Sequence, residues 1–433
     1  MKEYIKEAEK LVDFIHQSST MYHVVGNMAS VLESNGFKPL FLKDKWQLEK
    51  GGRYYVTKNG SAIFAFILGG SDLAQEGFRF VAAHSDSPCF RIKPDPEMVV
   101  DGAMLKLNTE VYGGPILMTW LDRPLSIAGR VVLRGGHPLH PKKVLVDVRR
   151  PLGVIPSLAI HMNRAVNEGV ELNKQKDMLP LLGMIDKTFN KEGFLLSLIA
   201  DELKVDKIDI LDCDLFLYET ERGTIFGPDQ DMILSPKLDD LAMAFAGLEA
   251  LIGSASHSAF NMLCIFDNEE VGSGTKQGAG SPVLKHILER IADQLGLSRE
   301  DYQRMLYHSF MISSDMAHAL HPNQPEKHDP VLHPVINGGP VIKLHAGQKY
   351  MTDGDSGAVF VSLCESAGVP CQKFVNRSDM VGGSTLGNIL TGQIDIRGVD
   401  IGNPMLGMHS ARETGGVMDH HYIKKVFTKF FTL

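Results

Sequence analysis

Apolar residues near the N-terminus recur with the period of an α-helix. One apolar face comprises Tyr4, Ile5, Ala8, Leu11, Val12 and Ile15, and a second comprises Val24, Val25, Met28, Val31 and Leu32. Asn35-Gly36 follows the second face and is typical of a helix end. Because residues three and four apart share one side of a helix, the pattern predicts two helices that bury these faces in a core.

Strand and helix patterns alternate up to about residue 90 and return near Ser235. The second run contains an apolar helix pattern over Leu241–Gly253, a strand pattern over Met262–Phe266, and helix patterns over Val283–Leu295 and Gly357–Ala367. Alternation of this kind is typical of a sheet covered by helices, with functional loops at the strand ends. It predicts a three-layer α/β fold.

The middle of the chain follows another pattern. Ser126–Arg134 and Lys143–Val148 are rich in β-branched residues, and short apolar runs around Ala159 and Leu215 also favour strands. This region is therefore expected to be mainly β.

The chain has 433 residues, which exceeds the usual size of a single domain and predicts two. We assign residues 91–234 to an inserted β-rich domain, and residues 1–90 and 235–433 to one discontinuous α/β domain. The insertion would bring the two flanking parts of the chain back together.

The charge balance argues against a nucleic-acid partner. Lys and Arg number 44, Asp and Glu number 52, and the net charge is −8 with histidine neutral. Nucleic-acid surfaces usually carry an excess of positive charge. The glycine-rich tract 272–280 also lacks the Gly-Lys-Ser/Thr ending of a phosphate-binding loop.

Cysteine usage predicts a cytoplasmic protein. The five cysteines, Cys89, Cys213, Cys264, Cys364 and Cys371, are dispersed and form no Cys-x-x-Cys pair, as expected in a reducing compartment. No apolar run approaches the ~18 residues of a membrane span. The charged N-terminal segment lacks the apolar core of a signal peptide. We therefore expect no membrane partner.

Glu269 and Glu270 are adjacent carboxylates that follow the apolar run 261–266. At the end of a half-buried strand such a pair is destabilising unless a positive charge, usually a metal ion, offsets the repulsion. A solvated acidic loop is the ordinary alternative. Isolated Asp and His residues at other predicted strand ends favour an active site.

Two further segments carry potential ligands. His84 ends the buried run Phe78–Ala83, and Asp86 follows it, which suits a metal-bound imidazole whose ring is oriented by a carboxylate. A structural histidine is the alternative. Asp239 and Asp240 precede the apolar helix, where an Asp can bind a metal or cap the helix.

Asp315 and His409 complete the set. Asp315 follows the apolar strand Phe310–Ser314, and His409 lies in a glycine-rich loop before the last helix. Oxygen and imidazole ligands without thiolates suit zinc, manganese or cobalt in a catalytic site. One bridging carboxylate, two flanking carboxylates and two histidines are what a two-metal hydrolase needs. We expect two divalent ions, zinc first, with cobalt and manganese as alternatives.

The order and the local amino-acid sequences of these segments resemble those of the aspartyl aminopeptidases, metallopeptidase family 18, from about His84 to Glu413. The chain departs from the family at Asp240, where Asn is usual, and at Asn388, where some members have Pro. The matching stretches include Ala83–Pro88, Leu238–Asp240, Asp267–Ser273, Ser314–His318 and Met408–Glu413.

The resemblance implies a zinc-peptidase fold and a dinuclear aminopeptidase that acts on peptides with a free N-terminus, preferring Asp or Glu. It implies Glu269 as general base outside the ligand shell. Asp239 is preferred over Asp240 as the bridging ligand because of its register after Leu238. The implied ligands are Asp239 between the ions, His84 and Asp315 at one, and Glu270 and His409 at the other.

Two more roles are implied by the resemblance. Lys343 matches the lysine that contacts the acidic side chain of the substrate, and a surface lysine is the alternative. His161 matches a histidine that reaches the neighbouring subunit's active site and stabilises the oxyanion, and a packed histidine is the alternative. The insert would be a dimerisation domain, with dimers building a tetrahedral dodecamer.

The candidate ligands are compatible with other functions. A deacylase, a carboxypeptidase or a glutamyl aminopeptidase could use the same metal scaffold. A catalytically idle assembly protein could keep the fold and bind metal for stability, although a purely structural site would not need Glu269 as an unliganded base.

Overall fold

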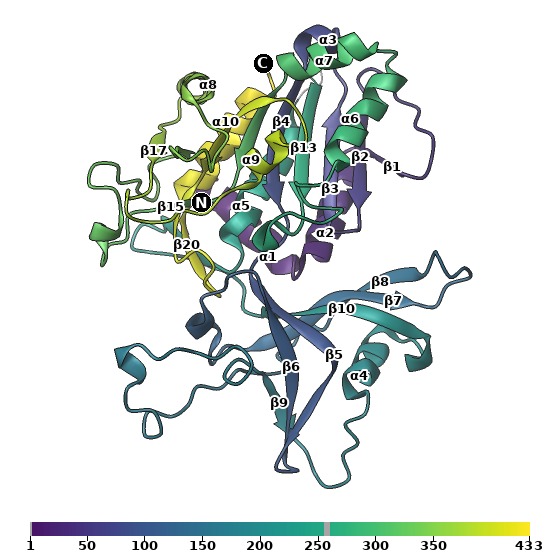
Figure 1. Ribbon diagram of the computed structural model, residues 1–433, viewed down its shortest axis with the longest axis vertical. Helices are drawn as coiled ribbons and strands as arrows, with labels where there is room; N and C mark the ends of the chain where they lie inside the picture. The colour runs from purple at the N-terminus through teal and green to yellow at the C-terminus, as the bar shows by residue number, and fades with distance from the viewer. Residues whose placement is uncertain (1, 255–259) are drawn as a thin grey trace.

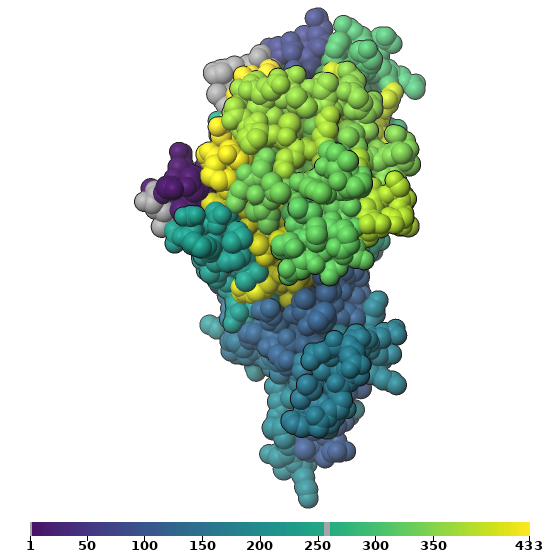
Figure 2. All heavy atoms as spheres, turned by 90° about the vertical axis from the view of Figure 1, so that its left-hand side faces the viewer, coloured from purple at the N-terminus to yellow at the C-terminus, as the bar shows by residue number. Residues whose placement is uncertain are grey.

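The computed structural model describes residues 2–254 and 260–433. It contains a nine-stranded, a six-stranded and a five-stranded sheet. Figure 1 shows the six-stranded sheet extending below the nine-stranded sheet and the helices that cover it. Figure 2 shows the same division from the side, where the middle of the chain forms the narrow end of the molecule.

Four neighbouring strands of the nine-stranded sheet run parallel. β4 lies between β13 and β14, and β14 pairs in turn with β18. The remaining strands extend the sheet on both sides and make it mixed. In sheet order the strands are β1 (Lys38–Leu40), β2 (Arg53–Lys58), β3 (Ala62–Ile67), β13 (Phe260–Phe266), β4 (Phe78–His84), β14 (Phe310–Ser314), β18 (Arg397–Gly402), β16 (Val341–Lys343) and β17 (Gln372–Phe374).

Helices cover both faces of this sheet because alternate strand residues point to opposite sides. On β3, Ile63 and Ala65 belong to one hydrophobic cluster, and Phe64 and Phe66 to another. The first cluster contains α1 (Glu3–Gln17), α2 (Met21–Ser34), α5 (Leu238–Gly253), α8 (Gly354–Ala367) and α10 (Val417–Phe430). The second contains α3 (Leu73–Glu76), α6 (Val283–Gln294), α7 (Arg299–His308) and α9 (Leu386–Thr391). None of the helices described is long and apolar enough to cross a membrane.

The predicted α/β fold is confirmed, with a central sheet that is mixed, and so are the two N-terminal helices with their buried faces. α5 is assigned from Leu238, but Asp239 and Asp240 have non-helical backbone angles. Regular helix therefore begins at Leu241, where the apolar pattern predicts it.

The six-stranded sheet is antiparallel throughout. α4 (Phe194–Leu203) contributes Leu195 and Ile199 to its core. In order, its strands are β8 (Lys142–Asp147), β7 (Leu125–Leu133), β10 (Ile210–Glu219), β5 (Cys89–Val100), β6 (Met104–Tyr112) and β9 (Leu181–Met184).

The predicted strand around Leu215 is present within β10, but the one around Ala159 is wrong. Residues 160–162 and 164–165 form turns, and Met162 donates its N–H to the Ala159 carbonyl. Ser157 donates its backbone N–H and its hydroxyl to the Asp122 carboxylate. The apolar side chains of this segment are exposed, so no sheet face selects a strand.

The five-stranded sheet links the end of the middle region to the C-terminal part. β11 and β12 lie before α5 in the chain, yet β12 pairs with β20. In order, its strands are β11 (Thr224–Phe226), β12 (Met232–Ser235), β20 (Glu413–Gly416), β19 (Pro404–Leu406) and β15 (Ala317–His318).

His420 makes stability sensitive to acid. Within the described chain neither of its ring nitrogens has a hydrogen-bond partner, and the ring stacks on Phe245 at 6.1 Å. Burial lowers the pKa of His420 from 6.5 to about 4. The unfolded chain therefore takes up a proton at a pH where the folded chain does not, and stability falls as pH drops from 6.5 toward 4.

We expect His420 to account for a loss of about 2 kcal/mol between pH 7 and pH 5. His420→Phe keeps the ring and cannot be protonated, so it should reduce the change in unfolding free energy by about that amount. Urea unfolding at the two pH values measures it, with exposed His308→Gln as control. An unchanged pH difference in His420→Phe would show that His420 is not responsible.

Candidate metal centre

The predicted ligands gather at one edge of the nine-stranded sheet. His84 is the last residue of β4, Asp315 follows β14, and Glu269 and Glu270 follow β13. Because these three strands are neighbours and parallel, their carboxyl ends lie at the same edge. Two other elements bring the remaining residues to it: α5 carries Asp239, and the loop from β19 to β20 carries His409.

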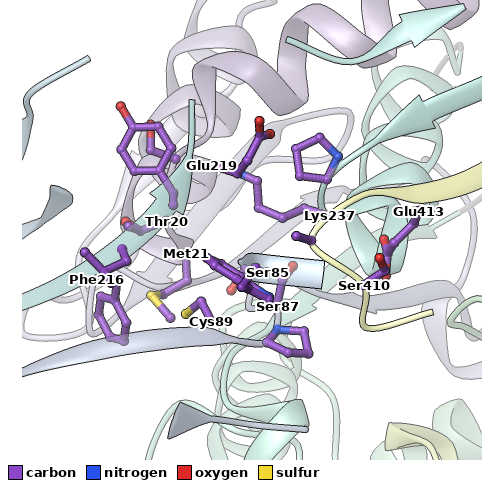
Figure 3. Close-up of a pocket in the computed structure, with 17 residues that line it drawn as sticks. Thr20, Met21, Ser85, Ser87, Cys89, Phe216, Glu219, Lys237, Ser410 and Glu413 are labelled. Carbon is purple, nitrogen blue, oxygen red and sulfur yellow. The ribbon is translucent and has the colours of Figure 1, made fainter. Parts of the chain in front are cut away.

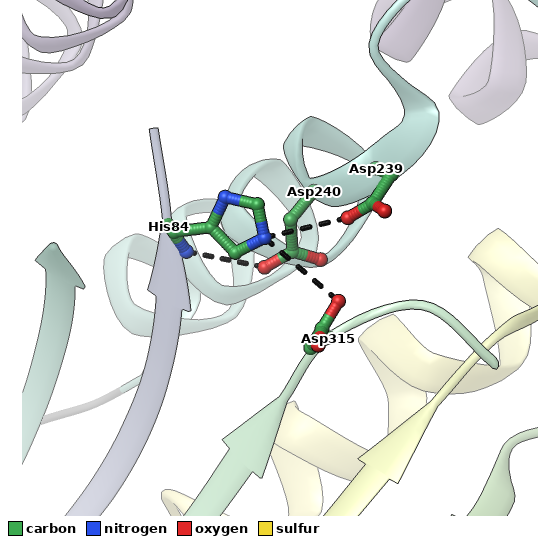
Figure 4. Close-up of side chains that lie close together, drawn as sticks. All are labelled: His84, Asp239, Asp240 and Asp315. Atoms are coloured by element: carbon green, nitrogen blue, oxygen red, sulfur yellow. Dashed lines mark hydrogen bonds and ion pairs between the residues drawn. The ribbon is translucent and has the colours of Figure 1, made fainter. Parts of the chain in front are cut away.

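The first group of side chains centres on His84 Nε2. This nitrogen lies 3.3 Å from Asp239 Oδ1 and 3.8 Å from Asp315 Oδ1. Figure 4 shows the ring nitrogen pointing toward both carboxylates, with an Asp240 oxygen facing the His84 backbone. Asp240 Oδ2 accepts the His84 N–H at 3.1 Å. All four residues offer ligand atoms within 4.8 Å of one another.

The second group lies on the other side of Asp239. His409 Nε2 is 3.3 Å from Glu270 Oε2 and 3.6 Å from Asp239 Oδ2. The two carboxylate oxygens of Asp239 thus face different groups, Oδ1 toward His84 and Oδ2 toward His409. This is the arrangement that a carboxylate shared by two cations requires.

Backbone carbonyls orient both imidazoles. His84 Nδ1 lies 3.0 Å from the Asp86 carbonyl oxygen, and His409 Nδ1 lies 3.1 Å from that of Gly114. A carbonyl oxygen can only accept, so in the neutral ring Nδ1 carries the hydrogen. The Nε2 lone pair of each histidine is then available to a metal ion.

Charge and unmet hydrogen bonds indicate that the centre is built for cations. Among the described residues, Asp239 Oδ1, Asp240 Oδ1 and Glu270 Oε1 are buried without hydrogen-bond partners. Burial and neighbouring carboxylates raise the pKa of Asp240 and Glu270 well above the ordinary range. Bound cations would satisfy these oxygens, and the oxygen and imidazole donor set suits zinc or manganese.

Lys343 is a cation already present in the centre. It is only 4% exposed, and its Nζ lies 3.4 Å from Asp315 Oδ2. Burial opposes the charge on Asp315, but Lys343 and His84 hold the pKa of Asp315 below its usual value. Lys343 therefore keeps Asp315 ionised, and it is not the surface lysine of the alternative interpretation.

Glu269 lies beside the first group. One of its carboxylate oxygens is within 4.8 Å of ligand atoms of His84 and Glu270. Burial, with the charges of Asp315 and Asp86 adding to it, raises the pKa of Glu269 to about 8. A carboxylate of this basicity can take up a proton near neutral pH.

Asp86 holds the two glutamates in place. Its Oδ1 accepts the N–H of Glu269 and its Oδ2 that of Glu270, each at 3.2 Å. Asp86 Oδ1 also lies 3.5 Å from His84 Nδ1. Asp86 thus touches both the histidine and the glutamate pair, but its backbone carbonyl, and not the predicted carboxylate, makes the shorter contact with the His84 ring.

Sequence reasoning assigned no role to two residues that organise the centre. Tyr112, at the end of β6, donates its hydroxyl to Asp86 Oδ2 at 2.7 Å. Glu413 accepts backbone N–H groups from both His409 and Asp239. The spacing of residues along the chain does not identify Tyr112. Glu413 lies in the matching stretch Met408–Glu413, but the sequence of that stretch does not show which groups Glu413 contacts.

His161 is not brought to the centre in this chain. It lies in the exposed turn at 160–162, and none of the candidate metal groups among residues 2–254 and 260–433 includes it. Its neighbours Leu158, Ile160 and Met162 are also exposed.

A separate cavity lies between the six-stranded sheet and the metal centre. Its volume is about 40 Å³, and Lys237, Glu219, Trp120, Ser87 and Glu413 are among its lining residues (Figure 3). Burial lowers the pKa of Lys237 to about 8. A space of this size holds a few water molecules and no peptide.

Comparisons with known proteins find relatives that match nearly the whole chain. The family model described as "Aminopeptidase I zinc metalloprotease (M18)" matches residues 14–431. The chain is 53% identical over 433 residues to a probable M18 family aminopeptidase 2 of Clostridium novyi, with 100% of both chains covered. It resembles Ape4 from the Ape4 and Nbr1 complex, with a TM-score of 0.95, 36% identity, and 99% of this chain and 86% of that chain covered. For the mApe1 dodecamer of S. cerevisiae the TM-score is 0.85 and the identity 29%, with 99% and 97% covered.

Proposed function

The chain belongs to the M18 family of zinc metallo-aminopeptidases, and from that premise we propose that it removes N-terminal Asp or Glu residues from peptides at a centre of two metal ions. The observation that carries the proposal is the position of Asp239. Its two oxygens face two separate groups of ligand atoms, at 3.3 Å from His84 and 3.6 Å from His409.

The five predicted ligands would hold the ions in two sets. Asp239 belongs to both, with His84 and Asp315 in the first and Glu270 and His409 in the second. The native metal is proposed to be zinc, with cobalt or manganese as substitutes. When bound, the ions supply Lewis acidity, which polarises the scissile carbonyl and lowers the pKa of water toward ~7.

Glu269 is proposed to move the proton. It takes a proton from the attacking water and delivers it to the leaving amine, which requires a carboxylate beside the ligands but free of them. The hydrogen bond from its N–H to Asp86 supports this role, because it fixes the backbone from which the carboxylate extends.

The preference for acidic residues rests on Lys343. Its charge is buried at the edge of the centre, where a charged hydrogen bond to a substrate carboxylate contributes about 1.5–3 kcal/mol. Loss of Lys343 would also leave Asp315 without its cation, which affects every substrate. The difference between substrate classes therefore measures the specificity role.

Lys343→Ala should lower kcat/KM for substrates with N-terminal Asp or Glu about 10–100-fold more than for those with Leu or Ala. Steady-state kinetics on the four substrates gives this ratio. Lys373→Ala, an exposed lysine on the neighbouring strand β17, should leave the ratio unchanged. Equal decreases in kcat/KM for both substrate classes in Lys343→Ala would show that Lys343 does not contact the acidic side chain of the substrate.

Assembly is the second part of the proposal. Residues 91–234 would form the dimerisation domain inserted in the catalytic domain of residues 1–90 and 235–433, and dimers would build a tetrahedral dodecamer. Two observations support this: exposed apolar side chains at Leu158, Ile160 and Met162, and the dodecamer solved for the yeast relative.

A panel of peptides with free and acetylated N-termini tests the function. We expect release of N-terminal Asp and Glu from free peptides only, loss of all activity after chelation, and partial recovery with zinc, manganese or cobalt. Cleavage of the acetyl group, or of acetylated peptides, would point to a deacylase or an endopeptidase on the same scaffold. Activity that survives complete removal of metal would contradict the proposal.

A further inference from the structure

Glu413, the first residue of β20, joins two parts of the metal centre through its carboxylate. Oε1 accepts the N–H of His409 at 2.7 Å, and Oε2 accepts the N–H of Asp239 at 3.1 Å. These amides come from different elements, the β19–β20 loop and the start of α5. One side chain thus ties the backbones of two proposed ligands together.

The surroundings of Glu413 would disfavour its charge without these contacts. Glu413 is 2% exposed, and no ion pair joins it to a cationic side chain in the described part of the chain. Burial and the charge of Asp239 raise its pKa well above the usual value, while the backbone amides oppose this. A buried carboxylate is costly unless hydrogen bonds offset the loss of water, and here backbone amides supply them.

Glu413 does not face a space that could hold substrate. With Ser410 and Lys237 it lines the cavity of about 40 Å³, as Figure 3 shows. The cavity has room for water only. Any effect of Glu413 on the centre must therefore pass through Asp239 and His409.

We propose that Glu413 is a positioning residue that fixes the backbones of Asp239 and His409 so that both side chains meet the same metal ion. The proposal rests on the proposed two-metal function. Asp239 belongs to both ligand sets and His409 to one of them, so a disturbed Glu413 should weaken the ion at His409 most.

Glu413→Gln isolates this role because the side chain keeps its size. The two N–H groups bond to different oxygens of Glu413, so the amide carbonyl can replace only one of these acceptors, and its NH₂ would oppose the other N–H. Asp419 provides a matched control. It is 1% exposed, and its two oxygens accept the N–H groups of Asn337 at 2.6 Å and Gly339 at 2.9 Å. Asp419→Asn makes the same chemical change away from the ligands.

Zinc affinity is measured by titrating the metal-free proteins with zinc against a chromophoric chelator. The cobalt-loaded proteins are compared by their visible absorption. We expect wild type to bind two zinc ions. Glu413→Gln should bind one of them, the ion that His409 would hold, at least about tenfold less tightly, and its cobalt spectrum should be altered. Asp419→Asn should lose thermal stability but keep both affinities within about twofold and the spectrum unchanged.

The outcomes separate the two proposals. Fewer than two zinc ions in wild type would contradict the proposed function itself. Two ions in wild type with unchanged affinity in Glu413→Gln would overturn the positioning role, as would equal weakening in Asp419→Asn. If Glu413→Gln does not fold, Glu413→Asp is measured instead, with its two oxygens on a shorter stem. Glu413→Asp should lower the affinity for the zinc ion at His409 at least about threefold, and unchanged affinity would overturn the proposal.

Discussion

Glu269→Gln should lower kcat by about 10²-fold or more and leave the zinc content unchanged, because a general base outside the ligand shell contributes to proton transfer and not to metal binding. The amide cannot take a proton from water, yet it preserves the size of the side chain and the N–H contact to Asp86. Steady-state kinetics and metal analysis of the same preparation measure both effects.

Exposed Glu300 on α7 provides the control, since Glu300→Gln removes a carboxylate far from the centre and should change neither quantity. Loss of one zinc equivalent from Glu269→Gln would place Glu269 among the ligands. Metal analysis is informative here because one Glu269 oxygen lies within 4.8 Å of ligand atoms of both His84 and Glu270, close enough to bind the same ion.

His161→Ala should be about 10²–10³-fold slower than wild type, because a donor to the developing oxyanion contributes roughly 2.7–4 kcal/mol. His161 is exposed and does not join the ligands of its own chain, so the account requires that it act on a partner subunit. His140→Ala, another exposed histidine of the middle region, should retain full activity.

Mixing two inactive variants tests the shared site. When Glu269→Gln and His161→Ala subunits are dissociated and reassembled together, a mixed dimer contains one site with both residues intact. Activity should return to an appreciable fraction of wild type. If mass measurement confirms subunit exchange and no activity returns, His161 has no role across the interface.

Periodicity predicted the elements whose buried faces are long and regular. The N-terminal helices repeat their apolar residues at helical spacing, and the central strands of the main sheet are short apolar runs that are buried on both faces. The prediction of a strand around Ala159 was wrong. The apolar run of this segment resembles a strand, but Ser157 is tied to Asp122 and the following side chains remain exposed, so tertiary contacts decide its turns.

The proposed ligands could be predicted because most of them end a strand pattern or precede a helix pattern, and His409 lies in a glycine-rich loop before the last helix. The register after Leu238 favoured Asp239 over Asp240 as the bridging ligand, and the side-chain positions support that prediction. Asp239 places one oxygen toward each histidine, whereas Asp240 uses one oxygen for the N–H of His84. The supporting contacts of Tyr112 and Glu413 join elements that are distant along the chain, and local sequence carries no signal for them.

Anomalous diffraction at the zinc edge, on crystals of the zinc-loaded protein, tests the central claim most directly. Two peaks per chain are expected, one on each side of Asp239. The first should lie against His84 and Asp315, and the second against Glu270 and His409. A single peak, or two peaks that do not share Asp239, would contradict it.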